Sequence, residues 1–365
     1  MFMMKTKEHY KVAHITNEIG NYMIGGIATV INELYSKREE NTCFIHLYDD
    51  SYNNRIATAN YPGDSDIYTV SMDRLEEISQ INFDIAVLHY YGLEDAVSEE
   101  ILGNRELVYV VHSVNTPEPY ERNNPFGIHT GIEASFRRLC SRAIKIICVS
   151  QAEKEKLLSI FGDLEGKVEV IYNGITFDQE EFVRDIPDQR TKFGYIGRLD
   201  YRKGILETVK ALDSKKKAQY YLACGKGDYN YLREIMLYAQ GAKMENRMHF
   251  LGYCTGERKV KFFQFIDCLI ISSLYEPFGM ILLEAFQYDV PVICSNNGGL
   301  AELLGDYKYQ YNPYLEGDLE QVLTQFEQAS PAEIHTECCK LKAHLKAFTK
   351  EEMTNRYNQL FADIL

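Results

Sequence analysis

The sequence predicts an α/β protein with two doubly wound domains, each a parallel sheet with helices packed on both faces. Strand-like apolar runs alternate with amphipathic helical stretches along the whole chain. The expected strands are KVAHIT, CFIHLY, DIAVLHYY, ELVYVVHS, IKIICVS and VEVIYN in the first half, and FGYIG, QYYLAC, MHFLGY, CLIISS and VPVICS in the second. These are more strands than one sheet of ordinary size holds, so we expect two sheets.

The chain length agrees with this division, because 365 residues correspond to two domains of ordinary size. The polar stretch 173–192 interrupts the alternation once, so we expect a first Rossmann-like domain over residues 1–175 and a second over residues 176–345. Residues 346–365 are expected to form a helix that packs back towards the first domain. Two such domains that face each other form a cleft, which is the expected binding site.

The composition restricts the class of protein. Hydrophobic residues make up 45% of the chain and charged residues 25%, which is typical of a globular protein. The formal net charge of −14 gives a surface that repels phosphate polymers, so nucleic acid is not an expected partner. No apolar stretch reaches the ~20 residues that span a bilayer, and the N-terminal MFMMKTKEHYK lacks the apolar region of a signal peptide. We therefore expect a cytoplasmic protein without membrane association.

Two glutamates bracket an apolar run in the second domain. CLIISS and VPVIC read as buried parallel strands, and the segment between them starts with a turn at Pro277 and Gly279 and continues with helical spacing. Glu276 then lies in the loop at the carboxyl end of a strand, and Glu284 lies about two turns into the following helix. Ligands bind at this end of a parallel sheet, because helix N-termini present free N–H groups there. The alternative is that both carboxylates face solvent.

A second strand–loop–helix unit, GYIGRLDYRKGILETVKAL, carries Arg198 and Lys203 in its loop and first helical turn. Cations at a helix N-terminus oppose the helix dipole, so this placement is unfavourable unless an anion binds between them. Local conflicts of this kind are typical of functional sites. Together with the glutamate loop, the two cations indicate an anion-binding site.

Three further strand ends carry candidate residues. Gly25 and Gly26 follow the first expected strand, where they either bring backbone N–H groups to an anion or form a plain turn into a helix. They do not complete the G-x-G-x-x-G pattern of a dinucleotide site. His112 ends the run VYVVHS, where it is either a structural residue or faces the cleft. Gly298 and Gly299 precede a helix in CSNNGGLAEL.

The strings GRLDYRKG, YEPFGMILLEA and NNGGLAEL together resemble the retaining glycosyltransferases of family 4, which have the GT-B fold. The second string matches the E-x7-E signature of that family. The Gly-Gly turn and the strand-end histidine fit as well, so matching motifs run from residue 25 to residue 302. The resemblance implies a first domain that binds the acceptor and a second that binds a nucleotide-sugar donor.

The resemblance also implies a role for each matching residue. Arg198 and Lys203 would hold the diphosphate of the nucleotide sugar. His112 would line the sugar near the reacting carbon, Glu276 would hold a sugar hydroxyl, and Glu284 would accept from the ribose hydroxyls. The other donor-binding groups would be the glycines of the first turn and the backbone N–H groups at the start of the E-x7-E helix: Gly25, Gly26, Phe278, Gly279, Met280 and Ile281.

The implied reaction moves a hexose or N-acetylhexosamine from a nucleotide sugar to an acceptor hydroxyl with retention, and UDP is the commonest donor nucleotide of that family. Negative charge accumulates on the departing diphosphate in such a reaction, and Arg198 and Lys203 would stabilise it. No second carboxylate is evident in the first domain as a general base or nucleophile. This suits a front-face mechanism in which the leaving phosphate helps to deprotonate the acceptor.

A metal site has one candidate, DSD at residues 64–66. It looks like the Asp-x-Asp that holds a divalent ion in the other main glycosyltransferase fold. Here it follows NYPG in a turn-rich loop, so we interpret it as a solvated turn. We expect no metal and no other cofactor, because Arg198 and Lys203 supply the positive charge.

Two other functions stay open. One is a GT-B nucleotide-sugar epimerase, which would use more acid and base residues facing the sugar than the sequence offers. The other is a catalytically silent protein that binds nucleotide sugars or acts as a scaffold for a partner. The acceptor stays open too: a small molecule, a glycan precursor or a protein would bind through loops expected at 50–65, 90–100 and 115–130.

Overall fold

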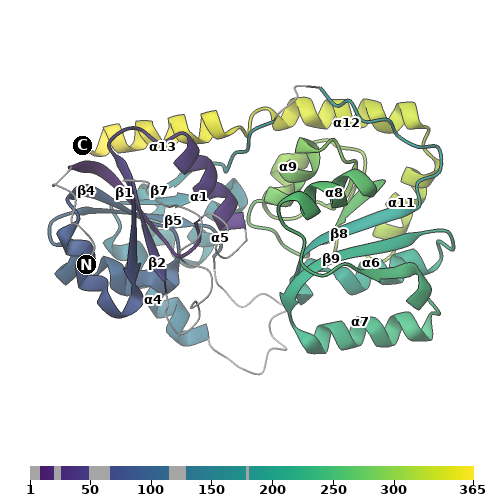
Figure 1. The fold of residues 1–365 in the computed structure, drawn as a ribbon, viewed down its shortest axis with the longest axis horizontal. Coiled ribbons are helices and arrows are strands. Elements are labelled where there is room, and N and C mark those ends of the chain that lie inside the picture. The colour runs from purple at the N-terminus through teal and green to yellow at the C-terminus, as the bar shows by residue number, and fades with distance from the viewer. Residues whose placement is uncertain (1–8, 20–25, 49–65, 115–128, 178–180) are drawn as a thin grey trace. The chain divides into compact units, whose positions relative to one another are not determined.

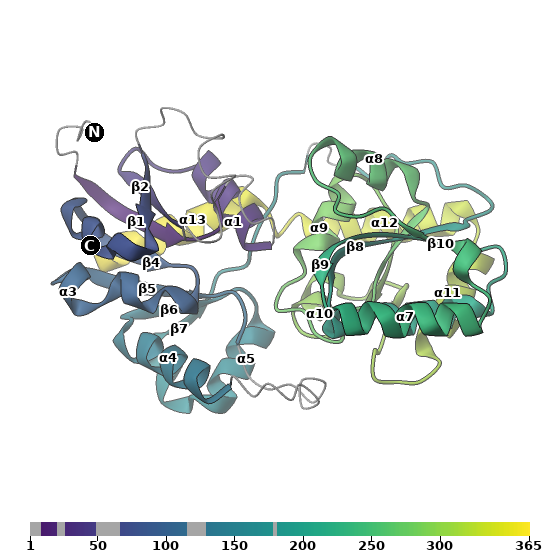
Figure 2. The same ribbon diagram turned by 60° about the horizontal axis from the view of Figure 1, so that its bottom comes forward.

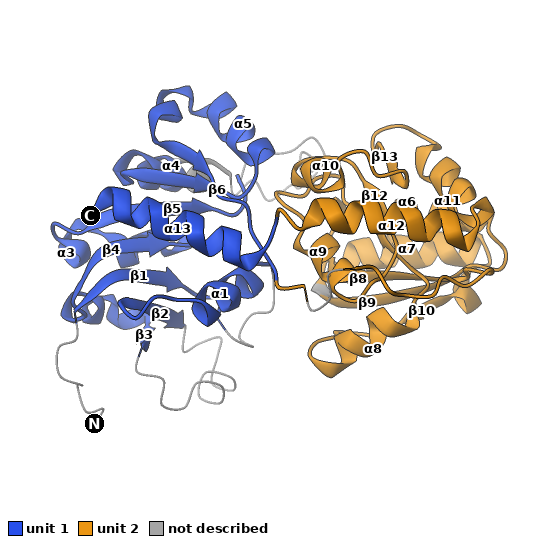
Figure 3. Cartoon of the chain, turned by 90° about the horizontal axis from the view of Figure 1, so that it is seen from above, with its two compact units in different colours: residues 1–175, 348–365 blue, residues 176–347 orange. Residues whose placement is uncertain are grey.

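The chain folds into parallel sheets with helices on both sides of each sheet (Figures 1 and 2). It divides into two compact units, one of residues 1–175 and 348–365 and the other of residues 176–347 (Figure 3). This architecture confirms the predicted α/β class with two doubly wound sheets. The structure is a computed structural model, and it describes residues 9–19, 26–48, 66–114, 129–177 and 181–365.

The first unit contains a seven-stranded parallel sheet with the strand order β3-β2-β1-β4-β5-β6-β7. The order reverses between β1 and β4, which are hydrogen-bonded neighbours. The strands are β1 (Tyr10–Thr16), β2 (Thr42–Tyr48), β3 (Ile67–Ser71), β4 (Phe83–Leu88), β5 (Glu106–Val111), β6 (Lys145–Cys148) and β7 (Val168–Val170).

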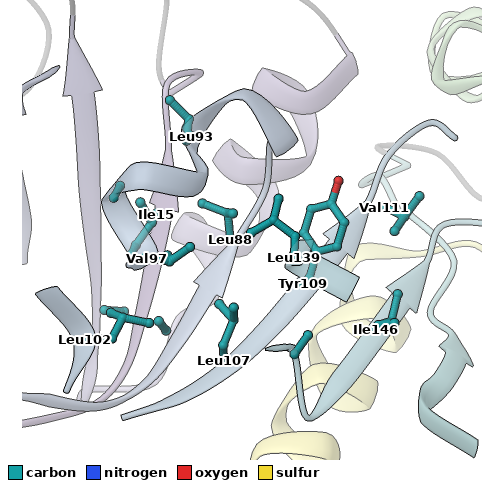
Figure 4. Packing of buried hydrophobic residues seen from close by; sticks show 14 of the residues in the cluster. Ile15, Leu88, Leu93, Val97, Leu102, Leu107, Tyr109, Val111, Leu139 and Ile146 are labelled. Carbon is teal, nitrogen blue, oxygen red and sulfur yellow. The ribbon is translucent and has the colours of Figure 1, made fainter. Parts of the chain in front are cut away.

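Helices connect these strands and cover the sheet. The α-helices are α1 (Gly26–Ser36), α3 (Glu99–Leu102), α4 (His129–Arg142), α5 (Gln151–Ile160) and α13 (Lys350–Ile364). The 3-10 segments are η1 (Met72–Gln80), η2 (Tyr91–Val97) and η3 (Gly162–Lys167). Figure 4 shows how residues from η2 and α4, such as Leu93 and Leu139, pack against Leu88 and Tyr109 of the strands. All four side chains are buried, which explains the continuous apolar runs in the sequence.

The last helix belongs to the first unit although it follows the second in the chain. The backbone N–H of Ile175 donates to the carbonyl of Phe348 (3.2 Å), and the N–H of Lys350 donates back to Ile175 (3.2 Å). Helix α13 packs beside α1 and buries Met353, Tyr357, Leu360 and Phe361. The chain therefore leaves the first unit and returns to it at the same place.

The second unit contains a six-stranded parallel sheet with the order β10-β9-β8-β11-β12-β13, which reverses between β8 and β11. Its strands are β8 (Lys192–Leu199), β9 (Gln219–Gly227), β10 (Met248–Phe250), β11 (Cys268–Ile271), β12 (Val292–Ser295) and β13 (Gln310–Tyr311). Its helices are η4 (Tyr201–Lys203), α6 (Ile205–Asp213), α7 (Tyr229–Gly241), η5 (Glu245–Arg247), α8 (Glu257–Phe265), α9 (Met280–Gln287), α10 (Gly299–Leu304), α11 (Asp318–Gln328) and α12 (Pro331–Leu345).

Two strands of these sheets are absent from the sequence-based prediction. Strand β3 lies at the edge of the first sheet, and its half-exposed start gives no continuous apolar run. Strand β13 is two residues long and lies at the edge of the second sheet. Edge strands of this kind are set by pairing with a neighbour, which a local pattern does not reveal.

A buried ion pair fastens α12 to the turn after α9. Lys342 donates to Asp289 Oδ1 at 2.5 Å, and the side chains are 3% and 9% exposed. The same ammonium donates to the carbonyl of Glu181 (2.9 Å), and the N–H of Val183 donates to Asp289 Oδ2 (3.3 Å). The pair therefore joins three segments of the second unit.

We expect Lys342→Met to lower the free energy of unfolding by about 3 to 5 kcal/mol, because it leaves the Asp289 carboxylate buried without its counter-charge. Urea denaturation followed by far-UV circular dichroism measures the loss. Lys340→Met is the matched control, since Lys340 pairs with Glu337 on the same helix at 63% exposure, and we expect a change within about 1 kcal/mol. Equal losses in the two variants would show that burial does not decide the effect.

Candidate active site

The candidate site of the second unit lies where the strand order of its sheet reverses. Strands β8 and β11 are neighbours there, and β12 follows β11 in the sheet. In open parallel sheets ligands bind outside the carboxyl ends of the strands at such a reversal. The loops that follow β8, β11 and β12 carry Lys203, Glu276 and Gly298, respectively. The structure thus gathers residues that are widely separated in the sequence.

Lys203 and Glu276 form an ion pair between the first two of these loops. The Lys203 ammonium donates to Glu276 Oε1, and the Ser273 hydroxyl donates to the same oxygen at 2.7 Å. The side chains of Lys203 and Glu276 are 20% and 11% exposed. Two of the residues predicted to act on the donor therefore contact each other directly.

The charge on Glu276 is stabilised by these contacts. Burial alone would raise the pKa of the Glu276 carboxyl, but the Lys203 ammonium, the Ser273 hydroxyl and the Arg202 guanidinium outweigh burial and lower this pKa below its ordinary value. Glu276 is therefore a carboxylate at neutral pH. It can accept hydrogen bonds from hydroxyl groups and cannot donate one.

Backbone contacts hold the Lys203 loop against the Glu276 loop. The Ser272 hydroxyl donates to the carbonyl of Lys203 (2.7 Å), and the N–H of Leu274 donates to the carbonyl of Arg202 (2.7 Å). Gly204 has φ of +59°, and a Cβ there would lie 2.0 Å from the carbonyl oxygen of Ser272. A glycine is required at this position, because the two backbones meet where a side chain would stand.

The third loop supports Glu276 from its other side. The N–H of Gly299 donates to the carbonyl of Glu276 at 2.8 Å, and Glu276 and Gly298 form an isolated parallel bridge. Gly298 has φ of +61°, and a Cβ there would lie 2.3 Å from the carbonyl oxygen of Glu276. The Gly-Gly motif of this loop thus acts on the backbone of the acidic loop, as a close approach between two backbones requires.

Arg198 lies on β8 rather than in the loop that follows it. Its side chain is exposed, and the pairing of β8 with β9 shifts in register between Gly197 and Leu199. Its carbonyl accepts from the Tyr195 hydroxyl at 2.5 Å. An irregularity of this kind re-aims a side chain at a sheet end. Within the Lys203 loop, Arg202 forms an ion pair with Asp200 at 3.0 Å, which the sequence did not suggest.

Glu284 lies in the second turn of α9, closer to the helix start than the sequence suggested. It is 8% exposed, and its carboxylate pairs with Lys259 of α8 at 2.7 Å. Nothing in the pattern of α8 pointed to Lys259 as a partner. Helix α9 begins at Met280 after Gly279 with φ of +106°, and the first N–H groups of a helix have no partner within it. Phe278, Gly279, Met280 and Ile281 surround this helix start.

The glycine turn of the first unit is described only in part. Gly25 lies outside the described residues, and Gly26 is the exposed first residue of α1. The Glu18 carboxylate accepts from the N–H of Ala28 at 3.1 Å, which places a negative charge at the start of α1. The Glu18 carboxylate thus occupies the helix start where the sequence predicts a diphosphate. Its negative charge would repel an anionic ligand at this position.

His112 follows β5 and is half-buried, and it is the end of a chain of three histidines. His14 Nδ1 lies 2.8 Å from His89 Nε2, and His89 Nδ1 lies 3.1 Å from His112 Nε2. Burial lowers the pKa of His14 to about 3 and that of His112 to about 4, and it lowers the pKa of His89 well below its ordinary value. Of these three histidines only His112 was predicted as a site residue, although KVAHIT and DIAVLHYY each contain a histidine near a strand end.

Of the metal candidate at residues 64–66, the structure describes Asp66 alone, which precedes edge strand β3 of the first sheet. Asp64 lies outside the described residues, and Asp66 accepts from Arg38 at 3.1 Å and from the Tyr10 hydroxyl at 3.4 Å. Asp66 is therefore a structural residue of this edge. Within the described ranges, no three His, Cys, Asp or Glu side chains are grouped as a metal ion requires. None of the described helices is long and apolar enough to cross a membrane.

The fold matches solved structures over nearly the whole chain. Sucrose-phosphate synthase from Thermosynechococcus elongatus aligns with a TM-score of 0.77 at 18% identity, covering 98% of this chain and 99% of that one. HepE from Anabaena, solved in complex with UDP and glucose, aligns with a TM-score of 0.78 at 17% identity, covering 97% and 100%. These neighbours are GT-B glycosyltransferases, so the chain has the GT-B fold.

The sequence comparisons assign both halves of the chain. Residues 24–179 match the sequence model of Glycosyltransferase Family 4, and residues 176–336 match that of Glycosyl transferases group 1. The chain therefore belongs to the glycosyltransferases of the GT-B fold.

Curated relatives carry names of the same kind. An uncharacterized glycosyltransferase of Methanocaldococcus jannaschii is 35% identical over 46% of this chain and 48% of its own length. Glycogen synthase of Mycobacterium tuberculosis is 27% identical over 43% of this chain and 38% of its own length. The chain thus spans about half or less of the length of these two relatives.

The buried histidines predict a loss of stability in weak acid. Burial lowers the pKa of a fourth histidine, His46, to about 4. The pKa values of His14, His89, His112 and His46 are therefore all lower in the folded than in the unfolded chain. The unfolded chain then binds more protons below about pH 6.5, so acid favours unfolding. We expect the free energy of unfolding to fall from pH 6.5 to pH 5 by up to about 1.4 kcal/mol per pH unit for each histidine.

Urea denaturation at a series of pH values measures this slope. His46→Phe removes one of the four groups, so we expect the slope to decrease by up to about 1.4 kcal/mol per pH unit. A stability that stays flat over this range would contradict the burial of neutral imidazoles.

Proposed function

We propose that the chain is a retaining glycosyltransferase that transfers a hexose or N-acetylhexosamine from a nucleotide sugar to an acceptor hydroxyl without a metal ion. Lys203 and Arg198 stabilise the diphosphate leaving group in this proposal. Glu276 accepts from hydroxyls of the transferred sugar, Glu284 accepts from the ribose, and the start of α9 faces phosphate or sugar oxygens. His112 lines the sugar, as the resemblance to the family implies.

The ion pair between Lys203 and Glu276 is the observation that carries the proposal. An ammonium and a carboxylate meet at the strand-order reversal, tied to three loops, with both side chains largely shielded from water. A nucleotide sugar offers what each partner needs, since its diphosphate is an anion for Lys203 and its sugar hydroxyls are donors for Glu276. In a water-poor site such preorganised charges stabilise developing charge more than water does.

UDP is the donor nucleotide that we propose. HepE was solved in complexes with UDP and with UDP-glucose, and these complexes support a uridine nucleotide by analogy of fold alone. The proposed acceptor is any molecule with a reactive hydroxyl: a small molecule, a glycan precursor or a protein. We propose a cytoplasmic location, where nucleotide sugars are available.

Slow hydrolysis of the donor tests the proposal without a known acceptor. The purified protein is incubated with a panel of nucleotide sugars, and nucleotide release is followed by mass spectrometry. We expect release from one donor, lowered roughly a hundredfold or more in Lys203→Ala, because the variant loses a charge that stabilises the leaving diphosphate. Lys210→Ala is the matched control, since Lys210 is an exposed lysine of α6 that pairs with Glu207.

Circular dichroism of Lys203→Ala shows whether the fold is kept. If the variant unfolds, Lys203→Met with Glu276→Gln removes both charges of the pair and should stay folded while release is lost. Release at the rate of the unaltered protein in a folded variant would refute the role of Lys203. Donor binding without release, with or without candidate acceptors, would favour a silent binding protein. Interconversion of the free donor into a second sugar would favour an epimerase.

Metal independence has its own test. We expect donor release in excess EDTA to equal release without it, because the positive charge at the diphosphate comes from Lys203 and Arg198. The rate is compared with and without the chelator, and after addition of Mg²⁺ or Mn²⁺. A loss of activity in EDTA that either ion restores would refute this part of the proposal.

A further inference from the structure

Three histidines form a continuous chain at the strand-order reversal of the first sheet. His14 lies on β1, His89 follows β4 and His112 follows β5, and these strands are neighbours in the sheet. The nitrogen–nitrogen distances are 2.8 Å and 3.1 Å. The ring planes are within 30° of parallel, with centroids 5.1 Å apart at 27° for His14 and His89 and 5.4 Å apart at 30° for His89 and His112. Both contacts have hydrogen-bond geometry.

The chain of three histidines couples the protonation of their rings. A neutral imidazole carries one N–H and one acceptor nitrogen. His89 uses both nitrogens within the chain, Nε2 towards His14 and Nδ1 towards His112. It must therefore donate in one direction and accept from the other. When the proton of one ring is placed, the positions of the other two follow.

His112 offers a single nitrogen to a ligand. Its Nε2 faces His89, so Nδ1 is the atom left for a group outside the chain. If His112 accepts from His89, its Nδ1 carries the proton and donates outward. If His112 donates to His89, its Nδ1 is an acceptor. The tautomers of His112 and His14 are thus linked through His89.

We propose that His14 and His89 are positioning residues that hold His112 in one neutral tautomer and thereby fix whether its Nδ1 donates to, or accepts from, the transferred sugar. This inference rests on the proposed function, in which His112 lines the sugar. It adds to that function two residues that contact no substrate.

The residues around the three histidines favour neutral imidazole rings over rings that carry a proton from one to the next. His14 and His89 are 3% and 0% exposed. The ring of His14 stacks on Phe44 at 4.9 Å and meets the rings of Tyr357 and Phe361. A proton taken up through His112 would leave a positive charge in this apolar setting, which burial opposes. The chain therefore orients a hydrogen bond and does not store a proton.

A fixed tautomer matters because a hydroxyl group that donates needs an acceptor at His112, and one that accepts needs a donor. A sugar hydroxyl that already donates elsewhere needs a donor at His112, and one that already accepts needs an acceptor. The wrong tautomer loses one hydrogen bond and leaves a polar group unsatisfied in a shielded position. We expect loss of the coupling to lower donor turnover roughly 5- to 10-fold.

Nitrogen NMR of protein labelled with ¹⁵N at histidine tests the proposal directly, because the shifts of Nδ1 and Nε2 distinguish a protonated from a bare nitrogen. The His112 signals are assigned by their absence in His112→Phe. His14→Phe keeps the stacking on Phe44 and removes the nitrogens at the end of the chain. His46→Phe is the matched control, since His46 is a buried histidine of the neighbouring strand β2 outside the chain.

We expect one tautomer at His112 in the unaltered protein, a changed tautomer ratio in His14→Phe, and no change in His46→Phe. His89→Gln, whose amide still donates and accepts but does not tautomerise, is the second variant if His14→Phe does not fold. Identical His112 signals in the folded chain variants, or a mixture of tautomers in the unaltered protein, would overturn the proposal. Absence of donor turnover would refute the proposed function alone, because the NMR result does not depend on turnover.

Discussion

All strands of a parallel sheet end at the same edge, and where the strand order reverses, the loops that follow two neighbouring strands lead away on opposite faces. This constraint brings the candidate residues together in both units. Lys203 and Glu276 are 73 residues apart and meet because β8 and β11 are neighbours. His14 and His89 are 75 residues apart and meet because β1 and β4 are neighbours. In each unit the contact follows from topology, because the intervening helices return the chain to the opposite edge and the next strand then ends beside the previous one.

The two units treat polar groups at this edge in opposite ways. In the second unit the acidic groups are paired with lysines: Glu276 with Lys203 and Glu284 with Lys259. In the first unit the histidines are neutral and hydrogen-bond only through their rings, since burial lowers the pKa of each. A paired charge can exchange its partner for a charged ligand, whereas a neutral ring offers direction without charge. The second unit is thus suited to an anionic ligand and the first to a neutral one.

Much of the fold and of the candidate site could be predicted from the sequence, and the features that could not be predicted share a physical cause. Buried parallel strands are apolar throughout, so β11 and β12 are evident as CLIISS and VPVIC, and the turn between them places Glu276 at a strand end. Edge strand β13 and the partner of Glu284 were missed, because pairing partners depend on which elements become neighbours. Lys259 is one of two lysines in α8, and only the packing of α8 beside α9 distinguishes it from Lys261. The direct contact between Lys203 and Glu276 was likewise outside the reach of a local pattern.

The direct contact between Lys203 and Glu276 also restricts the ligand. Both Lys203 and Ser273 bind the same carboxylate oxygen, Oε1. An anion that draws Lys203 away leaves Glu276 ionised, shielded from water and held by the Ser273 hydroxyl, which is unfavourable unless new donors arrive. A neutral sugar supplies hydroxyl donors to Glu276, but it supplies no anion to take the place of Glu276 beside Lys203. A molecule that joins an anionic group to hydroxyl groups satisfies both partners at once, and the proposed nucleotide-sugar donor is such a molecule.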